Sequence, residues 1–169
     1  MKGSDGLKIK DVRGKLPEHP TKSYRERPIS AIYYIAVHHS LTDDLPGGKD
    51  VEAFARYHVN DLGWPGIGYH YIVDGDGTVY KCHSADVKTY HVGKHNRASL
   101  GICLVGDFRD YEPSEVQYKA AVELINQCVE AYGVTNKNIL GHSEFSGYEW
   151  KKCPAIDMDT LRNKVKNYG

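Results

Sequence analysis

The segment Ile32-Tyr33-Tyr34-Ile35-Ala36-Val37-His38-His39 carries the clearest structural signal in this 169-residue chain. It is a continuous apolar run rich in β-forming residues, which is typical of a central strand buried on both faces. Successive side chains on a strand point to opposite faces of the sheet, so His38 and His39 cannot both face one site. Alternation alone does not say which of the two is a ligand candidate and which is structural.

Other elements can be placed around this run from the spacing of apolar residues. Further strands are expected at 69–73, 78–82, 100–105 and 139–141. Helices are expected at 50–60, 113–132 and 159–168. Ser114 with Gln117 resembles a capping box, and Gly133 is a natural helix stop. The turn Asp74-Gly75-Asp76-Gly77 makes one strand pair antiparallel. We therefore expect an α/β fold with a single mixed β-sheet packed by helices.

The length of the chain predicts one domain spanning residues 1–169. Residues 1–30 are polar and interrupted by prolines, so we interpret them as an N-terminal arm packed on a core formed by 31–169. Lysine plus arginine equals aspartate plus glutamate at 22 each, which argues against a nucleic-acid partner. The chain lacks both a run of about 18 apolar residues and an apolar N-terminal signal. We expect no membrane insertion and a cytoplasmic location.

Two of the four cysteines fit a reduced, buried environment. Cys103 lies in an apolar strand and Cys128 on an apolar helical face, so both are expected to be core thiols. If Cys153 binds a metal ion, an odd number remains, which does not suit a complete disulfide framework. The adjacent Lys151-Lys152 pair favours the thiolate of Cys153, the form that binds metal.

Histidine and cysteine residues follow two of the predicted strands. His142 comes directly after the strand at 139–141, in Gly141-His142-Ser143-Glu144, and Cys153-Pro154 follows eleven positions later. Two histidines and one cysteine are a ligand set that zinc accepts, with a fourth position left for water in catalytic sites. The spacing is neither that of a zinc finger nor of a His-Glu-x-x-His helix. With nine histidines in the chain, solvent-facing or core roles are the alternative for each.

Several motifs in order resemble those of one family. They are Val37-His38-His39-Ser40, Gly68-Tyr69-His70-Tyr71, Gly101-Ile102-Cys103-Leu104-Val105-Gly106, and Gly141-His142 with Lys151-Lys152-Cys153-Pro154. The chain resembles the zinc-dependent N-acetylmuramoyl-L-alanine amidases of the phage-lysozyme and peptidoglycan-recognition-protein superfamily. The resemblance runs from about Ile32 to Leu161 and does not cover the arm. It implies an amidase/peptidoglycan-recognition-protein-like fold.

The resemblance also implies roles for individual residues. It places one Zn²⁺ ion on His38, His142 and Cys153, which selects His38 over His39. It implies that Tyr69 and Lys151 assist catalysis.

Substrate contacts are implied for fewer residues. His91 and Asn96 resemble the substrate-groove segment of the family, and Trp64 is a further candidate for stacking on sugar or peptide, with packing as its alternative. The stretch between the second and third ligands is longer than in the compact phage members, with Phe145 to Trp150 as the insertion.

The activity implied is hydrolysis of the amide that joins N-acetylmuramic acid to L-alanine in peptidoglycan. Zinc lowers the pKa of bound water to about 7 and polarises the carbonyl. Lys151 would stabilise the developing oxyanion, a contribution worth roughly 3–4 kcal/mol for one well-placed donor. The expected partner is the glycan strand and stem peptide of peptidoglycan, bound by a monomer.

The resemblance therefore predicts an endolysin or autolysin, held in the cytoplasm until it is released to the cell wall. A non-catalytic module that binds muropeptide is the alternative. Such relatives typically lose the cysteine ligand or the tyrosine, whereas this chain has Cys153 and Tyr69. A zinc-stabilised structural domain would leave Tyr69 and Lys151 unexplained.

Overall fold

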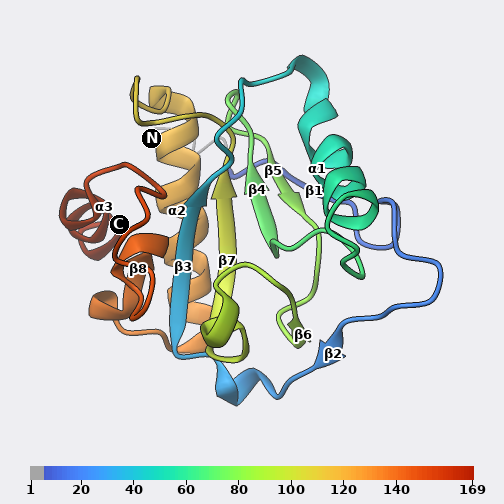
Figure 1. Ribbon diagram of the computed structural model, residues 1–169. Helices are drawn as coiled ribbons and strands as arrows, with labels where there is room; N and C mark the ends of the chain where they lie inside the picture. The colour runs from blue at the N-terminus through green and yellow to red at the C-terminus, as the bar shows by residue number, and fades with distance from the viewer. Residues whose placement is uncertain (1–5) are drawn as a thin grey trace.

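The main sheet consists of six strands in the part of the chain that the computed structural model describes, residues 6–169 (Figure 1). Its order is β1-β5-β4-β7-β3-β8. The strands are β1 (Ile9–Asp11), β3 (Tyr34–His39), β4 (Tyr71–Val73), β5 (Val79–Lys81), β7 (Ser99–Leu104) and β8 (Ile139–Gly141). Strand β3 runs parallel to β7 and β8, whereas β4 and β5 form the antiparallel hairpin. The predicted mixed sheet is confirmed.

Strand β3 is central because it pairs on both sides. It matches β7 over six residue pairs, from Tyr34↔Ser99 to His39↔Leu104, and β8 over three. Ile35, Ala36 and Val37 have no exposed surface. The continuous apolar run in the sequence thus corresponds to a strand covered on both faces, as parallel strands usually are.

Three helices pack on this sheet: α1 (Lys49–Asn60), α2 (Glu115–Tyr132) and α3 (Met158–Lys166). The Ser114 hydroxyl caps α2 by accepting a hydrogen bond from the backbone N–H of Gln117. Gly133 ends that helix with φ at 66°, a left-handed conformation that glycine adopts without strain. All three helices occupy the predicted segments to within two residues.

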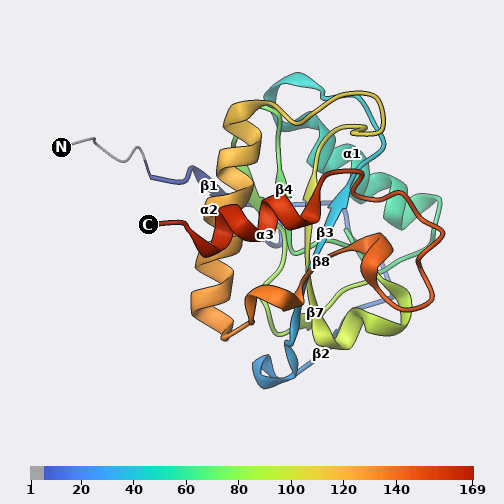
Figure 2. The same cartoon turned by 90° about the vertical axis from the view of Figure 1, so that its left-hand side faces the viewer.

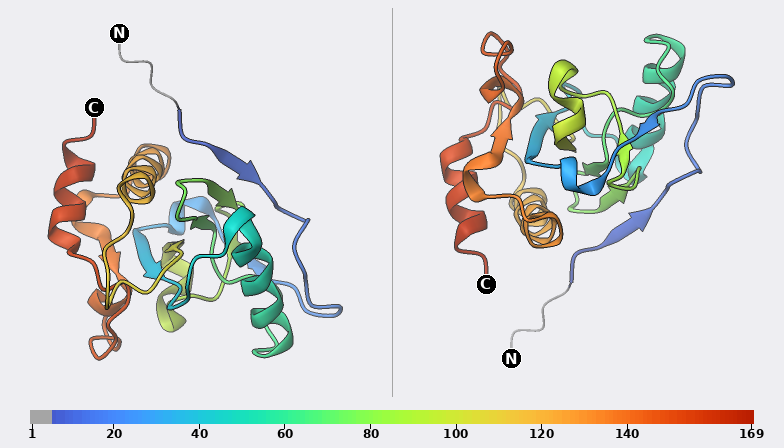
Figure 3. Two further views of the ribbon diagram at one scale, coloured as in Figure 1. Left: turned by 90° about the horizontal axis from the view of Figure 1, so that it is seen from above. Right: turned by 90° about the horizontal axis from the view of Figure 1, so that it is seen from below.

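The helices form two layers. In Figure 3, α2 and α3 lie on one side of the sheet and α1 on the other, and Figure 2 shows α3 crossing α2. One core cluster joins Ile35 and Val37 to α2 and α3. A second cluster joins Cys103 to α1. Alternation along β3 therefore decides which histidine faces which layer.

Two segments are more ordered than predicted. The irregular stretch before β7 contains β6 (Val87–Lys88) and a 3-10 helix, Gly93–Ala98. The N-terminal residues supply β1, which adds a parallel strand beside β5, and β2 (Arg25–Glu26), which pairs with β6. The N-terminal stretch is thus tied to the core by backbone pairing, which polar composition alone does not indicate.

Arg27 ties this N-terminal stretch to the core. Its guanidinium is buried and donates hydrogen bonds to four backbone carbonyls, those of Ala85, Asn96, Arg97 and Ser99. Burial lowers the pKa of Arg27 to about 10, so the side chain remains charged at neutral pH. A single side chain therefore connects the N-terminal stretch to the loop before β6, to the 3-10 helix Gly93–Ala98 and to the start of β7.

The cysteines are free thiols. Cys103 and Cys128 are core residues as predicted, and Cys82 is also buried. Within residues 6–169, none of the helices is long and apolar enough to cross a membrane.

A cluster of carboxylates joins the loop before α1 to the β4–β5 turn. Asp44, Asp50 and Asp74 offer oxygen atoms within 4.8 Å of one another, and Asp50 and Asp74 are buried. Asp50 accepts a hydrogen bond from the backbone N–H of Leu45. Burial, and then the Asp44 carboxyl, raise the pKa of Asp74 from 3.8 to about 7. The fold thus favours the protonated form of Asp74.

This shift predicts the pH dependence of stability. The folded protein holds the Asp74 proton more tightly than the unfolded chain, so the stabilisation is complete below about pH 4 and is lost as the pH rises through about 7. Asparagine is a neutral isostere of the protonated side chain. We therefore expect Asp74→Asn to be more favourable at pH 8 than at pH 4, with a difference of roughly 1–4 kcal/mol in its effect on the free energy of unfolding. Urea denaturation measures this, with the exposed Asp61→Asn as control. An equal effect at both pH values would contradict the assignment.

Candidate metal centre

The register between β3 and β8 brings two histidines together. Val37 pairs with Gly141, so His38 and His142, the next residue on each strand, lie side by side. Their ring centroids are 4.8 Å apart and both residues are buried. His39 points to the other layer, where its Nδ1 accepts a hydrogen bond from the backbone N–H of Phe108. Of the two strand-end histidines, only His38 therefore faces His142.

Backbone contacts carry Cys153 to the same place. The N–H of Ser143 donates to the carbonyl of Cys153 at 3.0 Å, and the N–H of His39 donates to its sulfur at 3.4 Å. A Cβ atom on Gly141 would lie 2.7 Å from the Pro154 ring, so glycine is required for this close approach. The pairs Gly141-His142 and Cys153-Pro154, eleven positions apart in sequence, are thus in direct contact.

The three side chains fit a zinc ion. Their ligand atoms all lie within 4.8 Å of one another, and His38 Nδ1 is 3.8 Å from Cys153 Sγ. Usual Zn–N and Zn–S bond lengths with a tetrahedral angle place such atoms about 3.6 Å apart. His142 Nε2 is buried without a hydrogen-bond partner among the described residues, a state that a metal ion would relieve. This group of three side chains could therefore hold a metal ion, and its donor atoms are ones that zinc accepts.

Burial sets the protonation of these ligands. Burial, followed by the neighbouring imidazoles, lowers the pKa of His38 well below its usual value. Burial and the Lys151 charge lower that of His142 to about 4, so both rings are neutral at neutral pH, as metal ligation requires. Lys151 also lowers the pKa of Cys153, as expected, but burial outweighs it and raises that pKa to about 11. The thiolate therefore depends on a bound cation.

Tyr69 lies next to the three ligands. Its ring centroid is 5.3 Å from that of His38 and 5.7 Å from that of His58. Burial, and then the Cys103 and Cys153 thiols, raise the pKa of Tyr69 well above its usual value. The phenol is therefore protonated at neutral pH and can donate a hydrogen bond.

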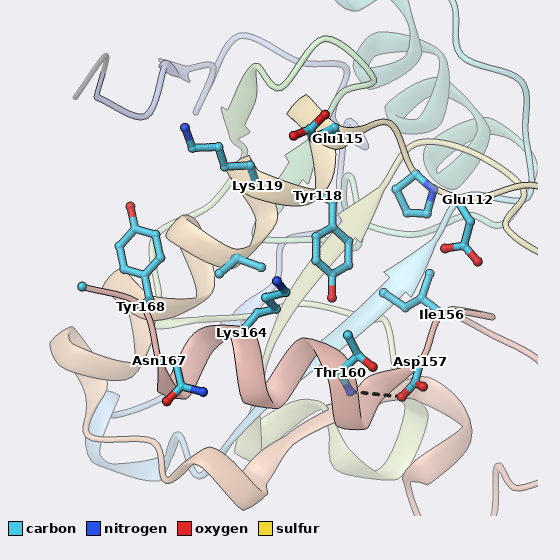
Figure 4. Close-up of a pocket in the computed structure, with 13 residues that line it drawn as sticks. Glu112, Glu115, Tyr118, Lys119, Ile156, Asp157, Thr160, Lys164, Asn167 and Tyr168 are labelled. Carbon is cyan, nitrogen blue, oxygen red and sulfur yellow. Dashed lines mark hydrogen bonds between the residues drawn. The ribbon is translucent and has the colours of Figure 1, made fainter. Parts of the chain in front are cut away.

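A groove of about 640 Å³ opens beside Tyr69. It is lined mainly by the loop after β3 and by one face of α1, through Ser40, Thr42, Asp43, Leu45, Asp50, Ala53, Phe54, Tyr57 and His58. The sequence had indicated none of these as site residues, because only the packing of α1 on the sheet brings them beside Tyr69. A larger hollow of about 830 Å³ lies between α2 and α3 and contains no histidine or cysteine (Figure 4).

Lys151 is half-buried and lies near the three candidate ligands. Its charge acts on all three ligand residues, and its Nζ is 4.6 Å from the centroid of the Trp150 ring. Trp150 is 75% exposed, so a packing role in the core does not apply to it. The predicted insertion packs inward instead through Phe145, which is 2% exposed, and Tyr148, whose ring is 5.0 Å from His142.

The three residues predicted to contact substrate do not line the groove beside Tyr69. His91 and Asn96 are buried, with His91 in contact with His38 and Asn96 Oδ1 accepting hydrogen bonds from two backbone N–H groups. Trp64 packs on His58 and Tyr90 at ring distances of 4.7 and 5.8 Å. Their substrate roles stay predictions.

The chain belongs to the N-acetylmuramoyl-L-alanine amidase family, whose model matches residues 28–156. The matched region contains the three ligands, Tyr69 and Lys151.

Relatives of this chain include proteins that recognise peptidoglycan and proteins of phage. It is 31% identical to peptidoglycan-recognition protein SD of Drosophila melanogaster over 130 residues, which cover 76% of this chain and 68% of the relative. The Ph2119 endolysin, from a Thermus scotoductus bacteriophage, is 30% identical with a TM-score of 0.71 and coverage of 86% and 91%. The complex of peptidoglycan recognition proteins LCa and LCx with tracheal cytotoxin matches at 25% identity, with a TM-score of 0.73 and coverage of 96% of each chain.

The contact between Gly141 and Pro154 predicts the effect of adding one methyl group. Gly141→Ala should push the Pro154 ring away and carry Cys153 with it, lowering stability by about 1–3 kcal/mol. Zinc affinity, measured by competition with a chromophoric chelator, should fall as well. Gly133→Ala is a useful comparison because it strains the backbone while its side chain would meet nothing within 4 Å. If Gly141→Ala bound zinc as tightly as the parent protein, this contact would not position Cys153.

Proposed function

We propose that this chain is a zinc-dependent N-acetylmuramoyl-L-alanine amidase that cleaves the bond between N-acetylmuramic acid and L-alanine in peptidoglycan. The observation that carries the proposal is the convergence of His38, His142 and Cys153 beside Tyr69, a residue that also lines an open groove. Membership of the amidase family and likeness to a phage endolysin support it.

The metal would supply chemistry that the side chains lack. When bound, zinc lowers the pKa of water to about 7 and polarises an amide carbonyl. The protein's own contribution is to hold two neutral imidazoles and one sulfur in place, each buried or half-buried. Burial also raises the pKa of Cys153, so a metal ion that binds there has to displace the thiol proton.

Two side chains are suited to act on the developing oxyanion. Tyr69 keeps its proton at neutral pH and can donate a hydrogen bond to that oxygen or to the attacking water. Lys151 brings positive charge close to the site. Donors aimed at charge that appears in the transition state stabilise it more than the ground state, which raises kcat.

A second candidate function is recognition of muropeptide without cleavage. It is favoured by the likeness to recognition proteins, including the LCa–LCx complex with tracheal cytotoxin. In this alternative the groove beside Tyr69 binds the stem peptide and the metal centre only stabilises the fold. Product formation separates the two functions, because both predict binding of the same ligand.

The first test is release of stem peptide from purified muropeptide, followed by mass spectrometry. We expect cleavage at the lactyl–alanine amide that stops with a strong chelator and returns with zinc. Cys153→Ala should abolish zinc binding and cleavage, whereas Cys128→Ala, on α2 in the opposite layer, should retain both. Binding without any product from the zinc-loaded protein would support the recognition function instead.

The second test separates the metal from the groups around it. Tyr69→Phe and Lys151→Met should keep stoichiometric zinc and bind muropeptide with little change, while each lowers kcat by about 10²–10³-fold. Single-turnover kinetics with zinc analysis of the same samples measures both quantities. Turnover close to that of the parent protein in either variant would remove that residue from the catalytic role.

A further inference from the structure

Among the described residues, His91 forms the one side-chain hydrogen bond that reaches His38, His142 or Cys153 from outside this group. Its Nδ1 is 2.9 Å from His38 Nε2, and His38 and His91 are 2% and 9% exposed. The ring planes are nearly perpendicular, at 80°. A buried hydrogen bond between two neutral imidazoles needs one donor and one acceptor, so the direction of this bond fixes both tautomers.

The position of Cys153 supplies that direction. His38 Nδ1 is the nitrogen that faces the Cys153 sulfur, at 3.8 Å. A nitrogen that binds metal carries no proton, so the single proton of His38 lies on Nε2 and is donated to His91 Nδ1.

The remaining nitrogen of His91 completes a chain of hydrogen bonds. With Nδ1 accepting, His91 carries its proton on Nε2, which is 3.5 Å from the Ser99 hydroxyl, at the limit of a hydrogen bond. That hydroxyl donates to the carbonyl of His95 at 2.7 Å, so its lone pairs are free to accept. The chain from His38 through His91 and Ser99 to a backbone carbonyl has a consistent direction at every step.

The surroundings of His91 hold its ring rigidly. Asn96 Oδ1 accepts hydrogen bonds from the backbone N–H groups of His91 and Val92, at 2.9 and 2.7 Å. A Cβ atom on Gly101 of β7 would lie 2.9 Å from the His91 ring, so this ring occupies space that only glycine leaves. Two backbone segments therefore keep the acceptor nitrogen in place.

We propose that His91 is a positioning residue that orients the zinc ligand His38 and fixes its tautomer. The inference rests on the proposed zinc centre and gives His91 a role that requires no contact with substrate. Without His91, the buried Nε2–H of His38 would lose its acceptor, which favours rotation of the ring or the tautomer that cannot ligate through Nδ1.

The test compares zinc affinity in two variants of His91. His91→Phe keeps an aromatic ring but accepts no hydrogen bond, and we expect its zinc affinity to fall about 10–100-fold. His91→Gln offers a carbonyl oxygen in place of Nδ1 and should stay within about threefold of the parent protein. His83→Phe is the matched control, since His83 is half-buried and hydrogen-bonded to the Ile67 carbonyl away from the metal centre.

Competition with a chromophoric chelator gives the affinities, and the cobalt-substituted protein reports the ligand field. If His91→Phe and His91→Gln weaken zinc binding equally, or if neither variant weakens it, the positioning role of His91 is refuted but the proposed metal centre is not. If the parent protein binds no zinc, the proposed function itself is refuted.

A measurement on the unaltered protein covers the case in which His91→Phe does not fold. Long-range ¹H–¹⁵N NMR spectra of the zinc-loaded parent protein should show His38 protonated on Nε2 and His91 unprotonated on Nδ1. Zinc bound through His38 Nε2 would overturn the inference directly.

Discussion

The parallel pairing of β3 with β8 is the constraint on which the site depends. A shift of one residue in β3 would turn His38 to the layer of α2 and α3, because side chains alternate between the faces of a sheet, and a shift in β8 would move His142 away from it. The same pairing places Gly141 where Pro154 can approach, so it also determines where the third ligand arrives. Three ligands far apart in sequence are thus positioned by one register.

Burial and charge act together at this centre. Removal from water keeps the two imidazoles neutral and also opposes ionisation of the cysteine, so these three side chains carry no net charge at neutral pH. A metal ion that binds them has to displace the Cys153 proton, so its affinity should rise with pH. Tyr69 shares this environment, whereas Lys151 is half-buried and has its Nζ over the ring of the exposed Trp150.

Much of this arrangement could be predicted from the sequence, and the remainder depends on tertiary contacts. The apolar run at β3 and the caps of α2 are local signals, so the strand and the helix were predictable. Alternation could not decide between His38 and His39, because that choice depends on which layer covers each face. Buried polar residues such as Gln117, whose side chain donates to the carbonyls of Val73 and Val105, leave no periodic signal. The groove depends likewise on how α1 packs.

The guanidinium of Arg27 lies one residue before the region that the family model matches. The four carbonyls that it satisfies belong to the segments leading into β6 and β7, which also hold His91 and Ser99. A shortened chain that began at residue 28 would bury these oxygens without a donor, at roughly 1–3 kcal/mol for each one left unpaired. The part of the chain needed for folding therefore begins upstream of the region that the family model matches. A protein trimmed to that matched region would be expected to lose stability even though it keeps all the candidate site residues.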